Sequence, residues 1–184
     1  NQVMSENICF PAKLTHSHID NLINKGIKHI VFPYIVYEKG AKGKENNTYN
    51  CPIVSSYNVV IKHLKENNKD IVIDNPVFTF KDETLLKKNC KEYFTKTFGV
   101  SVSDFDKAFQ KALKARQQFE EDMYQKNLEF YNKAQQEHRI IILLAGRPYH
   151  TDDLIQQSIS TIASHLGATV INEDIARNEN FLKD

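Results

Sequence analysis

The chain has 184 residues, of which 41% are hydrophobic and 26% are charged, and its formal net charge is +1. This composition is typical of a soluble globular protein of about one domain, and the balanced charge gives no reason to expect binding to nucleic acid or to an acidic membrane surface. No apolar run approaches the ~20 residues that a membrane-spanning helix needs. Three widely spaced cysteines argue against a disulfide framework, so we expect a reducing, cytoplasmic compartment.

The first hundred residues alternate between helical and strand-like patterns. Apolar spacing predicts helices over residues 11–25, 55–67 and 82–98, and strands over 27–32 and 70–74. Ser55 or Ser56 is the expected N-cap of the second helix, and Asp82 that of the third. Residues 34–50 have the composition of a polar loop. Its centre, residues 38–47, is rich in Gly, Lys and Glu, and loops of this length are often functional.

A much longer helical pattern follows. Ser103 and Asp106 resemble a capping pair, and apolar residues keep helical spacing almost to His138. A helix of this length spans on the order of 50 Å. We expect its aromatic stripe to face a core, and we expect the helix, over residues 101–138, to join two half-units.

The last part of the chain returns to a strand–helix–strand pattern. Residues 139–145 (RIIILLA) form the strongest strand signal, because they are apolar throughout, as in a parallel strand covered on both faces. A helix is predicted from Thr151 or Asp152 to His165, and a strand over 168–172. The whole alternation predicts an α/β fold: a parallel sheet with helices on both faces, built from two Rossmann-like half-units at residues 1–100 and 139–184.

Two cysteines are the leading candidates for chemistry. Cys9 and Cys51 each stand just before a proline and a helical pattern, so both thiols should lie at a helix N-terminus. Backbone N–H groups and the helix dipole favour a thiolate there, and a thiolate binds metals and iron–sulfur clusters or attacks electrophiles. In parallel sheets, ligands bind beyond the carboxyl ends of the strands. We therefore expect Cys9 and Cys51 to converge with a third strand-exit loop, which carries Arg147 and His150.

Other interpretations of these residues remain open. The cysteines could be buried, inert thiols, since free cysteine is among the most buried residue types. A zinc site would have to draw on Cys90 and on His16 or His18, which point to different sides of one helix. A nucleophilic cysteine would need a histidine base close by. Arg147 could bind a phosphate or carboxylate through both arms of its guanidinium, and His150 could serve as an acid–base group or ligand.

Three segments resemble motifs of a known family, and they occur in the same order. These segments are Ser5-Glu6-Asn7-Ile8-Cys9-Phe10-Pro11-Ala12-Lys13-Leu14 with His16-Ser17-His18-Ile19, Tyr49-Asn50-Cys51-Pro52-Ile53-Val54, and Leu144-Ala145-Gly146-Arg147-Pro148-Tyr149-His150. The chain, over about Gln2 to Asp174, resembles the acyl-CoA dehydratase activase-related proteins, or CoA-substrate-specific enzyme activases. These carry a domain related to the 2-hydroxyglutaryl-CoA dehydratase component.

The resemblance implies a function. Relatives in the dehydratase-component superfamily bind a [4Fe-4S] cluster through cysteines on strand-exit loops, and ATP-hydrolysing activases pass one electron to that cluster for dehydration of 2-hydroxyacyl-CoA. By position, Cys9 and Cys51 would be cluster ligands, and Arg147 and His150 would border the cluster pocket. Such relatives generally use a third cysteine, which is missing from the expected loops. Because the chain does not begin with Met and its end follows a strand-like segment, we expect the third ligand in sequence outside it.

Two further functions fit the sequence. One is a non-redox small-molecule or CoA-binding module in which the cysteines are structural. The other is an interaction domain that uses the long helix, residues 103–138, as its docking surface.

Overall fold

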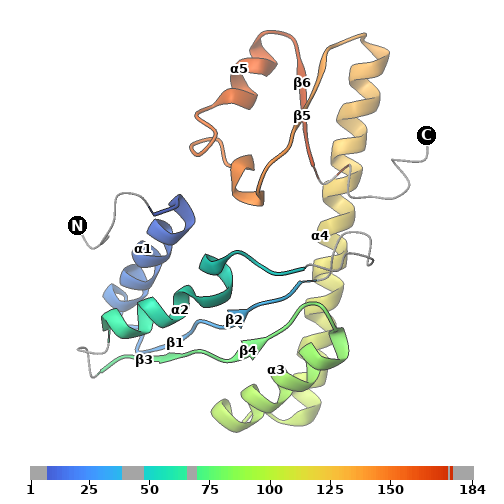
Figure 1. The fold of residues 1–184 in the computed structure, drawn as a ribbon. Coiled ribbons are helices and arrows are strands. Elements are labelled where there is room, and N and C mark those ends of the chain that lie inside the picture. Colours follow the sequence, from blue (N-terminus) through green and yellow to red (C-terminus); the bar gives the residue numbers. More distant parts are fainter. Residues whose placement is uncertain (1–7, 39–47, 66–69, 174, 176–184) are drawn as a thin grey trace. The chain divides into compact units, whose positions relative to one another are not determined.

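A computed structural model describes residues 8–38, 48–65, 70–173 and 175 (Figure 1). Residues 39–47, which make up most of the predicted loop centre at 38–47, and the residues before Ile8 lie outside this described part. The chain divides into two compact units, residues 1–107 and 108–184. Each unit is described by itself.

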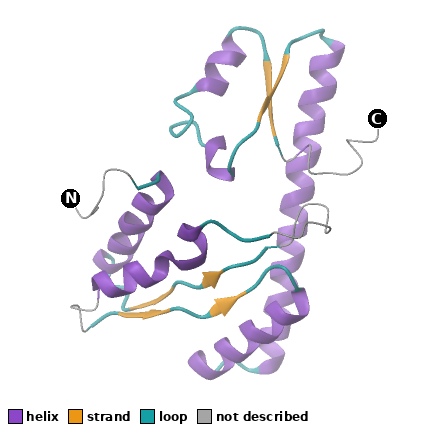
Figure 2. Ribbon diagram, viewed as in Figure 1, coloured by secondary structure: helices purple, strands orange, loops and turns teal. Residues whose placement is uncertain are grey.

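The first unit contains the same helix–strand–strand arrangement twice. Helix α1 (Phe10–Asn24) precedes strands β1 (His29–Val31) and β2 (Tyr34–Ile35), and helix α2 (Pro52–Lys65) precedes β3 (Val72–Asp74) and β4 (Val77–Phe78). The pairs β1–β3 and β2–β4 are both parallel (Figure 2). The sequence pattern predicts a loop over residues 34–50, where the structure has β2, and it predicts no strand at β4.

The strand pairs β1–β3 and β2–β4 have the same register, although the pairing is interrupted between them. Val72 lies opposite His29 and Phe78 lies opposite Ile35, so partners are 43 positions apart in each pair. Pro33 and Pro76 are separated by the same 43 positions and lie between the two pairs. Proline has no N–H to donate to a strand ladder, so regular pairing is interrupted at Pro33 in one segment and at the equivalent Pro76 in the other. The two halves of the first unit are thus matched in space as well as in order.

The core of the first unit lies between its helices and one face of its strands. Ile30 and Ile73 are register partners and both are buried. They pack with residues of the two helices, namely Ala12 and Ile19 of α1 and Tyr57 and Ile61 of α2. Helices α1 and α2 therefore cover the same face of the strands (Figure 1).

Helix α3 (Glu83–Phe98) lies on the opposite face of the strands (Figure 1). Asp74 follows the inward-facing Ile73 and so points to the other side. There its carboxylate accepts hydrogen bonds from His29 Nε2 at 2.7 Å and from the Tyr93 hydroxyl of α3 at 2.8 Å. Burial alone would raise the pKa of the Asp74 carboxyl, but these hydrogen bonds outweigh it and hold the pKa below its ordinary value of 3.8. Burial and the bond to Asp74 raise the pKa of Tyr93 to about 12.

We expect Asp74→Asn to destabilise the chain at neutral pH by about 1 kcal/mol, because it weakens two hydrogen bonds to a half-buried charged group. The carboxyl pKa is lower in the folded chain, so its contribution is complete above the ordinary value and is lost as pH falls through the folded value. Urea unfolding at pH 7 and at pH 3 should show the variant and the wild type converging in acid. Asp82→Asn, which keeps an N-cap of equal quality, is the control. A difference that persists unchanged in acid would contradict this account.

The helix ends in the structure confirm some of the predicted caps and contradict others. Asp82 caps α3 by accepting a hydrogen bond from the Leu85 N–H at 2.8 Å, and Gly99 ends it at φ 65°, as predicted. Helix α4 (Val102–Gln136) is capped by Ser101, whose hydroxyl accepts the Asp104 N–H at 3.1 Å, so the predicted Ser103–Asp106 cap is wrong. Helix α2 begins at Pro52, not at Ser55 or Ser56.

The second unit contains most of α4, the parallel pair β5 (Ile141–Leu144) and β6 (Thr169–Asn172), and helix α5 (Ile159–His165). The predicted helix from Thr151 or Asp152 is wrong in its first half. A short 3-10 helix, η1, covers Pro148–Thr151, and Gln157 and Ser158 then take positive φ values of 54° and 59°, which a continuous helix does not allow.

The predicted α/β class is confirmed in its broad form. Within the described residues the strands form three separate two-stranded parallel pairs. A full Rossmann-like sheet with helices on both faces is therefore not observed. None of the described helices is long and apolar enough to cross a membrane.

Candidate functional site

Cys9 occupies the N-cap position of α1. Its backbone is extended, with φ −63° and ψ 154°, and its carbonyl oxygen accepts the N–H groups of Ala12 and Lys13 at 3.1 and 3.3 Å. Pro11 stands in the first turn of the helix, where its missing N–H costs no hydrogen bond. The thiol is exposed. The predicted location of Cys9 at a helix N-terminus is thus what the structure shows.

Cys51 has the same relation to α2. It directly precedes Pro52, the first residue of the helix, and its carbonyl oxygen accepts the N–H groups of Val54 and Ser55 at 2.9 and 3.0 Å. Its thiol is half-buried. The preceding Asn50 anchors this helix start to β2, because its side-chain amide donates to the Ile35 carbonyl at 3.1 Å. The two cysteines therefore stand at equivalent positions of the two helix–strand–strand halves.

A buried polar pair connects the two cysteine-bearing helices. His16 of α1 and Tyr57 of α2 are 4% and 8% exposed, and His16 Nε2 lies 2.7 Å from the Tyr57 hydroxyl. Burial raises the pKa of Tyr57, and the charge of a nearby Cys9 thiolate raises it further.

Tyr57 is not among the candidate residues that the sequence patterns indicate. The adjacent Val59 and Val60 are 50% and 39% exposed, so they do not form the inner apolar stripe of α2. The stripe instead runs through Ile53, Tyr57 and Ile61, which are spaced four residues apart. That spacing was the signal that could have found Tyr57.

Apolar side chains surround the two helix starts. Phe10, which follows Cys9, is 48% exposed, Val54 in the first turn of α2 is 45% exposed, and Tyr49 is 64% exposed. Asn58 of α2, only 2% exposed, holds the interrupted strand beneath by donating to the Phe32 carbonyl at 3.2 Å. Exposed apolar or aromatic side chains thus lie next to both cysteines along the chain.

The described residues contain no group of three or more His, Cys, Asp or Glu side chains that could hold a metal ion. Cys90 lies within α3, half-buried, and burial raises the pKa of its thiol. His16 is buried whereas His18 is exposed, so these two do not face one ion together. A closed zinc site is therefore not found among the described residues.

The loop that carries Arg147 and His150 belongs to the second unit. The Arg147 N–H donates to His150 Nδ1 at 2.9 Å, so the imidazole closes the loop on itself. A side chain at Gly146 would meet His150 Nδ1 at 2.7 Å, which is too close for any Cβ. Arg147 is exposed. The expected convergence of this loop with Cys9 and Cys51 stays a prediction.

Comparison with known proteins gives one result. A sequence model of the family described as "CoA enzyme activase uncharacterised domain" matches residues 1–176. No curated protein and no solved structure matches the chain. The matched span includes both cysteines, the His16–Tyr57 pair and the Arg147–His150 loop. The chain therefore belongs to the CoA enzyme activase domain family.

Proposed function

We propose that this chain takes part in activating the dehydration of an acyl-CoA, and that Cys9 and Cys51 supply two thiolate ligands of a [4Fe-4S] cluster that transfers electrons. The observation that carries the proposal is the equivalent placement of the two cysteines. Each is the residue directly before the helix of one of two matched helix–strand–strand halves. Two thiols placed by the same local structure are more readily explained by one shared ligand than by two unrelated structural roles.

Cysteine thiolates are the right kind of ligand for such a cluster, but the chain supplies only some of them. Iron–sulfur clusters are held by cysteine thiolates, usually four of them. Cys9 and Cys51 would provide two, and the remaining ligands would come from outside the described residues. A bound cluster of this type supplies one-electron transfer. The chain's own contribution is to present sulfur at helix N-termini, where backbone N–H groups stabilise negative charge, and to hold both helices in place through His16 and Tyr57.

The remaining parts of the proposal follow from family membership. A CoA enzyme activase domain is expected to work with a dehydratase component, and an ATP-hydrolysing activase domain or subunit would deliver the electron. Arg147 and His150 would border the cluster, and a 2-hydroxyacyl-CoA would be the substrate of the assembled system. Such chemistry is expected in the cytoplasm.

The test is anaerobic reconstitution with iron and sulfide of the longer protein, which includes this chain and the sequence expected to supply the remaining ligands. Iron and sulfide analysis and a visible spectrum follow. We expect bound iron with charge-transfer bands in the wild type, and loss of most of it in Cys9→Ala and in Cys51→Ala. Cys90→Ala is the matched control, because Cys90 on α3, like Cys9 and Cys51, forms no disulfide, and its removal should leave iron binding unchanged. Circular dichroism would show that all three variants stay folded.

A second readout identifies the ligating thiols directly. Bound cluster should protect Cys9 and Cys51, but not Cys90, from alkylation, as measured by mass spectrometry. A wild type that takes up no iron, or variants at both positions that retain all of it, would contradict the proposal. The cysteines would then be structural, as in a non-redox binding module.

A further inference from the structure

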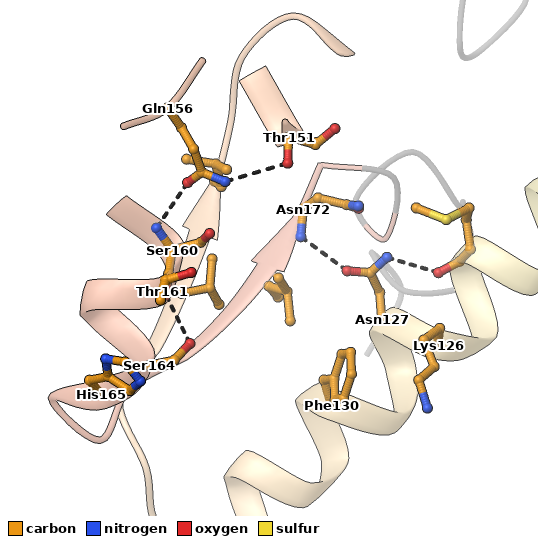
Figure 3. Close-up of a pocket in the computed structure, with 14 residues that line it drawn as sticks. Lys126, Asn127, Phe130, Thr151, Gln156, Ser160, Thr161, Ser164, His165 and Asn172 are labelled. Atoms are coloured by element: carbon orange, nitrogen blue, oxygen red, sulfur yellow. Dashed lines mark hydrogen bonds between the residues drawn. The ribbon is translucent and has the colours of Figure 1, made fainter. Parts of the chain in front are cut away.

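We propose that a pocket in the second unit binds the phosphopantetheine arm of a CoA thioester. The pocket has a volume of about 410 Å³ and lies between α4, α5 and the strand pair β5–β6 (Figure 3). Pockets of ~300–1,000 Å³ are the usual size for small-molecule sites. This site shares no residue with the cysteine site, but the choice of a CoA thioester as its ligand rests on the proposed function. Because its test measures ligand binding and not iron, the two proposals can fail separately.

The position of the pocket in the fold is that of a ligand site. Leu144 and Asn172 are the last residues of β5 and β6, and both line the pocket. The two strands are parallel, so their carboxyl ends meet at one edge, where ligands bind in sheets of this kind. The pocket then extends along α5, past Ser160 and Ser164.

Two buried amide side chains hold the walls in place. Asn127 of α4 is 6% exposed; its Oδ1 accepts the Asn172 N–H at 3.0 Å, and its Nδ2 donates to the Met123 carbonyl at 2.8 Å. Gln156 accepts the Ser160 N–H at 2.9 Å, which fixes the start of α5 (Figure 3). Because these bonds connect the strand end, α4 and α5, the walls are formed before any ligand arrives, and binding requires little ordering.

The chemistry of the lining indicates the class of ligand. Carboxamides and hydroxyls alternate with apolar side chains such as Phe130 and Val170, and none of the described residues that line the pocket is Asp or Glu. Such a surface suits a chain in which amide and hydroxyl groups are separated by methylene and methyl groups, as in pantetheine. The absence of acidic side chains from the lining disfavours a cationic ligand.

Lys126 provides a position for the phosphate. Its ammonium group lies 5.0 Å from the centre of the Phe130 ring and pairs with Glu129 at 2.7 Å. Both partners of that ion pair are more than half exposed, so the pair is weak and is easily exchanged for a phosphate.

The test is titration of the full chain with 4′-phosphopantetheine, pantetheine and AMP, followed by calorimetry or by NMR of the β6 amides. We expect saturable binding of phosphopantetheine and binding of pantetheine that is about five- to tenfold weaker, because the latter lacks the phosphate. Lys126→Gln should remove that difference. Lys133→Gln, on the same helix and in a similar exposed pair with Glu137, should retain it.

A second pair of variants tests the pocket itself. Ser164→Phe places a large side chain inside it and should abolish binding, whereas Ile162→Phe, at an exposed α5 position outside the lining, should not. The proposal is overturned if phosphopantetheine does not saturate the wild type, or if Ser164→Phe binds as well as Ile162→Phe. Binding of AMP in preference to phosphopantetheine would also overturn it, because the site would then recognise the nucleotide end.

Discussion

Ile61→Ala is expected to destabilise the first unit by about 3–4 kcal/mol, the largest effect of any single change considered. Ile61 has no exposed surface and lies at the centre of the cluster that joins α1, α2, β1 and β3. Truncation removes buried methyl and methylene groups and leaves a cavity that neighbours from four elements cannot all collapse into. Natural domains are stable by only ~5–15 kcal/mol in total, so the variant should retain a small margin of stability.

The measurement is urea unfolding followed by circular dichroism, with hydrogen exchange of the β1 and β3 amides to locate the effect in the first unit. Val60→Ala is the matched control, because Val60 is the preceding residue of the same helix and is 39% exposed. Its truncation should cost well under 1 kcal/mol. If the two variants were equally stable, Ile61 would not be at the centre of the core.

Tyr57→Phe is expected to cost about 1–3 kcal/mol, although it removes only one oxygen atom. The lost hydroxyl lies 2.7 Å from Nε2 of His16, and His16 is 4% exposed, so water cannot easily replace the missing partner. Tyr49→Phe is the control. It removes a similar hydroxyl, which accepts a 2.9 Å bond from Tyr37, but at a residue that is 64% exposed.

A double-mutant cycle separates the bond from the packing. His16→Leu combined with Tyr57→Phe replaces both polar partners with apolar ones, and it should be clearly more stable than the sum of the single losses predicts. The His16–Tyr57 pair connects the helices that start at Cys9 and Cys51. The Tyr57→Phe variant should therefore also bind less iron after reconstitution. Additive energies in the cycle would show that His16 and Tyr57 do not depend on one another.

Local signals in the sequence predict several elements well. The helix from Asp82 to Gly99 is correct at both ends, since a side-chain N-cap and a left-handed glycine act on neighbouring residues alone. The positions of Cys9 and Cys51 at helix starts are also correct, because a nearby proline favours the first helical turn. Competing local signals are harder to separate. Ser101 and Ser103 are both good caps, and the structure uses the first.

The sequence by itself thus determined the order of the longer helices and of the strands β1, β3, β5 and β6, together with the α/β class, the two helix-start cysteines and the family. Only the tertiary structure decided the 43-residue register that matches Pro33 with Pro76, the His16–Tyr57 pair and the pocket beside β6. The physical reason is the distance along the chain. Caps and helix ends depend on residues within one turn, whereas these strand pairs and buried hydrogen bonds join residues 28 to 45 positions apart. Their energies exist only once the chain has folded.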